Sequence, residues 1–237
     1  MSDKIIVCDH KENAVPRQPP GDIVGTFIAG GIGEPELPPI YADFAALDWC
    51  WRKLSHERIG FFGRRKYILF QEGPVEYKRT DWGPLGWYDA TYREFDEYRN
   101  WLANWDGQQM KEELAQTDII VTPPWRVDDL MNDFGRSRSM ADAGVLGRTL
   151  YDHGVNTTST RIYPYIFATR WSVFDRFMKF AVPFAKEIEP YITADDSTNE
   201  AYKKRPMAYV LERAFSLWLE NSGLNARIMP ILNCWEM

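Results

Sequence analysis

A short basic segment, Gly63-Arg64-Arg65-Lys66, is the part of the sequence best suited to binding a phosphorylated ligand. It lies in a basic block, residues 52–79, where eight lysine or arginine residues against three glutamates give a net charge of +5. The following block, residues 81–118, carries −6. Arginine forms forked hydrogen bonds with phosphate oxygens, and lysine adds a compact positive charge. The block therefore predicts a site for a phosphorylated small molecule; the alternative is a solvated basic surface.

Two carboxylates are candidates for proton transfer. Glu212 follows the apolar run 209–211 and precedes Arg213. A carboxylate in this setting is either a general base whose pKa is tuned by its surroundings or a buried ion-pair partner of the arginine. Asp43 is the second candidate, because it stands near the start of a predicted helix and close to the basic segment; the alternative is a charge that favours the helix N-terminus.

Asp9, His10 and Lys11 follow directly after a short β-branched run, residues 5–8. Open α/β sheets bind their ligands beyond the carboxyl ends of the strands. We therefore expect these three residues to contact a nucleotide. The alternative for His10 is a turn histidine whose ring is satisfied by its neighbours.

The elements that position these residues alternate between strand and helix patterns. Apolar and β-branched runs predict strands over residues 5–8, 59–62, 66–70, 117–122, 161–168 and 227–232. Helical spacing of apolar residues predicts helices over residues 41–54, 88–116, 171–191 and 206–221. This alternation favours an α/β fold with a mostly parallel, Rossmann-like sheet flanked by helices.

Glycines and prolines refine these boundaries. Asp106-Gly107 predicts a break in the second helix, and Gly223 predicts the end of the last one. Pro230 inside the final strand predicts an edge position, because proline cannot donate to a neighbouring strand. Residues 13–40 are expected to form one long connection, whereas residues 126–160 show no pattern that assigns them.

Composition narrows the class of protein. The 237 residues are 45% hydrophobic and 26% charged, which fits one folded domain over residues 1–237. The 15% aromatic content excludes a disordered chain. The net charge of −6 argues against a protein coated in nucleic acid. Three widely spaced cysteines, no long apolar run and no signal-peptide core favour a cytoplasmic protein without disulfides or a membrane span.

Common catalytic and nucleotide-binding motifs are missing from the sequence. Residues 25–32 have the glycine spacing of a P-loop but lack its Lys-Ser/Thr, and Gly31-Ile-Gly33 lacks the third glycine of a dinucleotide site. Neither the G-x-S-x-G pattern nor the H-E-x-x-H pattern occurs. The three histidines are too scattered to predict a metal site.

Five blocks carry a family resemblance through their order along the chain. They are Val7-Cys-Asp-His-Lys11, Tyr41-Ala-Asp-Phe-Ala-Ala-Leu-Asp-Trp-Cys-Trp-Arg52, Ile59-Gly-Phe-Phe-Gly-Arg-Arg-Lys-Tyr67, Asp118-Ile-Ile-Val121 and Arg205-Pro-Met-Ala-Tyr-Val-Leu-Glu-Arg-Ala214. In this order they resemble the domain-of-unknown-function 4422 family, which includes bacterial capsule and O-antigen galactofuranosyltransferases. The resemblance implies a variant of the GT-A glycosyltransferase fold.

The chain departs from the family motifs at several positions. Asp43 stands where the family has glutamate, and Ala208 where it has glycine. Gly63 replaces the histidine of the motif I-G-L-x-H-Y-R-R-Y. Tyr165 replaces the asparagine of an Asn-Met-Phe segment.

The resemblance implies transfer of a sugar from a nucleotide-diphosphate sugar, a UDP-sugar of the galactose type, to an acceptor hydroxyl in polysaccharide or glycoconjugate synthesis. We expect an inverting displacement with Glu212 or Asp43 as the base and with Arg65 and Lys66 stabilising the leaving group. The residues expected to bind the donor are Asp9, His10, Lys11, Tyr41, Arg64, Arg65, Lys66, Tyr67, Arg205 and Arg213.

We expect no metal or other cofactor, because the sequence has no Asp-x-Asp pair of the kind with which sugar transferases commonly hold a divalent cation. Two alternatives stay open. One is a sugar transferase that decorates a modified base in DNA, which salt-sensitive retention on DNA would favour. The other is a non-catalytic domain that binds sugar nucleotides or glycans. The donor sugar, the acceptor and the oligomeric state are not set by the sequence.

Overall fold

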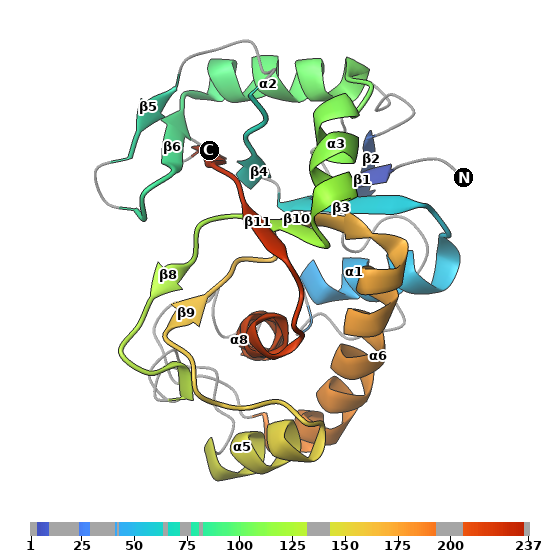
Figure 1. The fold of residues 1–237 in the computed structure, drawn as a ribbon, viewed down its shortest axis with the longest axis vertical. Coiled ribbons are helices and arrows are strands. Elements are labelled where there is room, and N and C mark those ends of the chain that lie inside the picture. The colour runs from blue at the N-terminus through green and yellow to red at the C-terminus, as the bar shows by residue number, and fades with distance from the viewer. Residues whose placement is uncertain are drawn as a thin grey trace.

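The computed structural model describes residues 4–9, 24–28, 41, 43–63, 66–71, 77–80, 83–131, 143–192 and 206–234. The described strands form a ten-stranded sheet and a separate two-stranded sheet. Helices lie on both faces of the large sheet (Figure 1). The predicted α/β class is therefore confirmed.

The large sheet has the order β11-β7-β10-β3-β4-β12-β6-β5, with β1 paired to β3 and β2 paired to β1. Its strands are β1 (Lys4–Asp9), β2 (Val24–Ile28), β3 (Arg58–Gly63), β4 (Lys66–Ile68), β5 (Lys78–Arg79), β6 (Trp87–Ala90), β7 (Ile119–Val121), β10 (Phe167–Arg170), β11 (Ala226–Ile228) and β12 (Ile231–Cys234). The small sheet pairs β8 (Trp125–Arg126) with β9 (Arg161–Ile162).

The expectation of mostly parallel pairing is wrong, because the sheet is mixed. Strand β1 is parallel to β2 and β3, β11 is parallel to β7, and β12 is parallel to β6. By contrast, β10 runs antiparallel to both of its neighbours, β3 and β7, and β4 runs antiparallel to β3 and β12. Continuous apolar runs are typical of parallel strands buried on both faces, but β10 is buried in this way between two antiparallel neighbours.

The helices divide between the two faces of the sheet (Figure 1). Their bounds are α1 (Asp43–Lys53), α2 (Tyr92–Asn104), α3 (Gln108–Gln116), α5 (Ala143–Asp152), α6 (Trp171–Ile188) and α8 (Pro206–Asn221), with a 3-10 turn at Glu189–Tyr191. Gly107 separates α2 from α3 with a φ of 73°, as the sequence predicts. Within the described ranges, no helix is long and apolar enough to cross a membrane.

Each face of the sheet has its own hydrophobic core. One core joins α1, α6 and α8 to the sheet, and the other contains the aromatic residues of α2. Strand β7 contributes to both, because successive side chains of a strand point to opposite faces. Ile119 and Val121 lie in the first core, and Ile120 lies in the second. Most of the aromatic residues therefore pack in these two cores.

Several predicted segments are divided differently in the structure. The expected long connection over residues 13–40 contains strand β2, and the unassigned region 126–160 contains helix α5. The first residues of the predicted helix 88–116 belong to β6. The final predicted strand is two strands: β11 lies at the sheet edge, whereas β12 lies inside the sheet between β4 and β6. Pro230 falls between them, where no ladder donor is needed.

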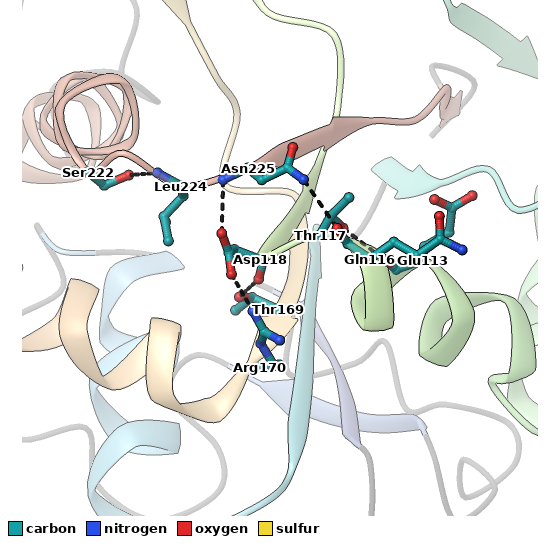
Figure 2. A network of polar contacts seen from close by, with 9 residues as sticks. All are labelled: Glu113, Gln116, Thr117, Asp118, Thr169, Arg170, Ser222, Leu224 and Asn225. Carbon is teal, nitrogen blue, oxygen red and sulfur yellow. Dashed lines mark hydrogen bonds and ion pairs between the residues drawn. The ribbon is translucent and has the colours of Figure 1, made fainter.

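A polar network joins the strands at one end of the sheet (Figure 2). The Asp118 carboxylate accepts hydrogen bonds from the Arg170 guanidinium and from the backbone N–H of Asn225, the latter at 2.9 Å. The Asp118 carbonyl accepts one from Thr169 Oγ1 at 2.7 Å. Arg170 is paired with Arg58, the first residue of β3. The network therefore lies at the amino end of β3, away from the end where ligands bind in such sheets.

We expect Asp118→Asn to lower the free energy of unfolding by about 1 to 3 kcal/mol, because the variant loses the charge that holds Arg170. Urea denaturation of the wild type and the variant measures this loss. Asp152→Asn, at the exposed end of α5, is the matched control and should leave the urea midpoint unchanged. An unchanged midpoint for Asp118→Asn would show that the network does not stabilise the sheet.

Candidate active site

The carboxyl ends of two strands meet at one edge of the sheet. Strands β1 and β3 are parallel, and Cys8 lies opposite Gly63 in their register. Gly63 also pairs with Lys66, the first residue of β4, so β4 begins at the carboxyl end of β3. The backbone of Asp9, the last residue of β1, follows the Cys8–Gly63 pair and therefore lies at the same end of the sheet as Gly63 and Lys66. This is the edge at which open α/β sheets bind ligands.

Glu212 lies on α8, which packs through most of its length in the core against α1 and α6. Desolvation of its partly buried side chain raises the pKa of its carboxyl. The positive charges of Arg213 and Lys66 act in the opposite direction, as does a hydrogen bond from the backbone N–H of Tyr165. The negative charge of Asp43 raises the pKa further. The net effect is a carboxyl that binds its proton more tightly than an ordinary glutamate.

These interactions bring together residues from three separate elements. Asp43 is the first residue of α1, Lys66 the first residue of β4, and Glu212 lies in the middle of α8. Each of the first two interacts electrostatically with the Glu212 carboxylate. The Glu212 carboxylate therefore lies within electrostatic reach of a second carboxylate and of Lys66, which begins β4 at the carboxyl end of β3. Such a group can accept a proton and stabilise a developing negative charge.

Lys66 also contacts an aromatic ring. Its Nζ lies 5.3 Å from the centroid of the Trp87 ring, a cation–π distance. Trp87 is fully buried, and its Nε1 donates a hydrogen bond to the Pro123 carbonyl at 3.0 Å. The indole is thus held in place beneath the ammonium. This support fixes the position of the positive charge near Glu212.

Residues 163–165, which precede β10, are hydrogen-bonded to α8 at Glu212 and Ser216. Ser216 Oγ accepts a hydrogen bond from the Tyr163 backbone N–H at 2.8 Å and donates to the Glu212 carbonyl at 3.0 Å. The Tyr165 N–H then reaches the Glu212 carboxylate. Ser216 is fully buried, so this connection is shielded from water. Sequence reasoning missed Ser216, because its bonds are not visible in any local pattern.

Of the other predicted site residues, Tyr41 and Tyr67 make their contacts elsewhere, Arg213 adjoins Glu212, and the rest lie outside the described residues. The Tyr41 hydroxyl donates to Glu189 Oε2 at 3.0 Å, and the Tyr41 side chain is buried. Tyr67 is 1% exposed, with its ring stacked on Phe95 at 4.6 Å in the aromatic core. Arg213 is buried and donates to the Tyr209 carbonyl at 3.0 Å. His10, Lys11, Arg64, Arg65 and Arg205, and the side chain of Asp9, lie outside the described residues.

Comparison with protein families gives a match that covers most of the chain. The model described as "Domain of unknown function (DUF4422)" matches residues 35–223, which include Asp43, Lys66 and Glu212. The chain belongs to the DUF4422 family. The suspected membership is thereby confirmed for this chain. Among curated protein sequences, none matches this DUF4422 chain.

A solved structure shares the fold of this DUF4422 chain. It is described as the WbbM bifunctional glycosyltransferase in its apo form, and it superposes with a TM-score of 0.72 at 16% sequence identity. The match covers 99% of this chain and 45% of WbbM. The chain therefore spans less than half the length of that protein. At this identity the likeness establishes a common fold.

Proposed function

We propose that this protein is a glycosyltransferase that moves a sugar from a nucleotide-diphosphate donor, a UDP-sugar, to an acceptor hydroxyl. The observation that carries the proposal is that Asp43 and Lys66 both act electrostatically on the Glu212 carboxylate, with Lys66 at the carboxyl end of β3. The shared fold with a bifunctional glycosyltransferase supports it. The GT-A type of fold and a role in polysaccharide or glycoconjugate synthesis are parts of the same proposal.

The proposed mechanism is a single displacement with inversion. The Glu212 carboxylate accepts the proton of the acceptor hydroxyl, whose oxygen attacks the anomeric carbon from the face opposite the diphosphate. The bond between that carbon and the phosphate oxygen breaks, and its electron pair leaves with the nucleoside diphosphate. Lys66, together with Arg65, which precedes it in the sequence, neutralises the charge that develops on this leaving group. Asp43 is the second candidate for the base.

The choice of Glu212 over Asp43 rests on its surroundings. Its pKa is raised by burial, which makes the carboxylate a stronger base than an exposed glutamate. The Tyr165 N–H fixes the orientation of the carboxylate, and Lys66 lies on the side of the strand ends. A base and a cation in one group are the two functions that transfer from a diphosphate sugar requires.

We expect transfer to continue in the presence of EDTA at a rate within about twofold of the untreated enzyme, since the proposal assigns leaving-group stabilisation to fixed cations rather than to a metal ion. The measurement is release of UDP from UDP-galactose, UDP-glucose and UDP-galactofuranose with glycan acceptors. Mn²⁺ or Mg²⁺ is restored in parallel samples as the control. Strict dependence on added metal would contradict the metal-independent mechanism. UDP binding without any transfer would contradict the proposal that the protein is an enzyme.

A further inference from the structure

Tyr165 carries a buried hydroxyl that lacks a hydrogen-bond partner among the described residues. The residue is 5% exposed, and its ring packs against Phe215 at 5.4 Å and Phe177 at 6.3 Å between centroids. Buried hydroxyl groups are nearly always paired, because an unpaired one loses its hydrogen bonds to water without replacement. A group of this kind in a folded protein calls for an explanation.

The position of Tyr165 sets it apart from other unpaired groups. Its backbone N–H bonds to the Glu212 carboxylate, and its hydroxyl interacts electrostatically with Glu212 and Asp43. Tyr77, whose buried hydroxyl is also unpaired among the described residues, faces Glu94 and Glu97 of α2 instead. The Tyr165 hydroxyl thus lies near the two carboxylates of the candidate site.

The residue after Tyr165 packs against the end of β3. A Cβ at Gly63 would lie 3.3 Å from Ile166 Cδ1, closer than an ordinary van der Waals contact. The absence of a side chain at Gly63 therefore leaves room for Ile166 at the carboxyl end of β3. Ile166 packs in the core that contains α2, whereas Tyr165 packs in the core that contains α8.

We propose that the Tyr165 hydroxyl recognises the transferred sugar by a hydrogen bond to one of that sugar's hydroxyl groups. This inference rests on the proposed glycosyl transfer. Burial and the two carboxylates keep the phenol protonated, so it can both donate and accept. A phosphate oxygen is a poor partner beside Glu212 and Asp43, because like charges repel. A neutral sugar hydroxyl fits, since it also donates and accepts.

The chain offers a matched pair of variants. Tyr163 is exposed to the same extent as Tyr165, 5%, and lies two residues away in the same segment. Its hydroxyl, however, is hydrogen-bonded to the Arg161 guanidinium. Tyr165→Phe removes an unpaired hydroxyl, whereas Tyr163→Phe removes a paired one. The two substitutions delete the same atom from similar surroundings and differ in whether that atom already has a partner.

We expect Tyr165→Phe to bind UDP as the wild type does and to bind the preferred UDP-sugar about five- to tenfold more weakly, the loss of one neutral hydrogen bond. Calorimetry with UDP, UDP-galactose, UDP-glucose and UDP-galactofuranose measures both affinities. Without ligand, the thermal midpoint of Tyr165→Phe should equal or exceed that of the wild type. Tyr163→Phe should melt at a lower temperature and keep the wild-type affinities.

Deoxy analogues of the preferred donor identify the hydroxyl that is recognised. The wild type should bind one analogue about five- to tenfold more weakly than the parent sugar, and Tyr165→Phe should bind that analogue and the parent equally. If Tyr165→Phe keeps the full preference for the UDP-sugar over UDP, the inference is wrong and the proposed function stands. A wild-type protein that binds neither UDP nor any of these donors contradicts the proposed function and the inference with it.

Discussion

Glu212→Gln is expected to reduce the rate of glycosyl transfer by about 100- to 10,000-fold, the usual contribution of a positioned general base. The amide has nearly the same shape and its oxygen still accepts the Tyr165 N–H, but it cannot take a proton from the acceptor. Steady-state kinetics with the preferred UDP-sugar measure the loss in kcat. Glu220→Gln, a surface glutamate of α8 that pairs with Arg161 at 3.7 Å, should retain wild-type kcat.

The stability of Glu212→Gln separates catalysis from folding. Because burial raises the folded-state pKa of Glu212, the folded protein holds this proton more tightly than the unfolded chain. The corresponding stabilisation is fully present below the ordinary glutamate pKa of 4.5 and is lost as the pH rises through the folded value. At neutral pH the neutral glutamine avoids this loss, so the variant should melt no lower than the wild type.

The same shift affects the pH dependence of turnover. A base acts only when deprotonated, so kcat should rise with pH through a value above 4.5. Asp43→Asn, measured in parallel, tests the second candidate. Wild-type turnover by a folded Glu212→Gln protein would exclude Glu212 as the base, and loss of turnover in Asp43→Asn alone would transfer that role to Asp43.

Lys66→Met is expected to lower kcat by about 100- to 1,000-fold, comparable with removal of one group that stabilises the charge of a transition state. Methionine keeps most of the apolar length of the side chain and can still pack on Trp87, but it carries no charge. The loss should fall on kcat more than on KM, since the charge on the leaving diphosphate develops in the transition state.

Lys66→Met should also change the pKa of Glu212. The Lys66 charge lowers the pKa of Glu212, so its removal should move the acid limb of the pH–rate profile to higher pH. Lys53→Met, at the exposed end of α1, removes the same charge from the basic block and should change neither kcat nor the profile. If both variants behave alike, the block acts through its overall charge and Lys66 has no specific role.

Local patterns in the sequence were sufficient to predict many of the helices and strands. The β-branched run at residues 5–8 became β1, and the apolar stripe of residues 206–221 became α8 with the predicted bounds. Gly107 and Gly223 mark helix ends, with φ values of 73° and 68° that glycine adopts readily. These features follow from backbone geometry and side-chain periodicity within one segment, which the sequence displays directly.

Only the tertiary structure decided how the segments combine. Pairing in a sheet joins residues distant in the chain, so no local pattern reveals that β10 runs antiparallel between β3 and β7. The same holds for side chains: Tyr67 turns into the aromatic core. Residue types and family motifs singled out Glu212, Asp43 and Lys66 one by one. Their meeting with Tyr165 depends on the packing of α1, β4 and α8, because proximity in space is a property of the whole fold.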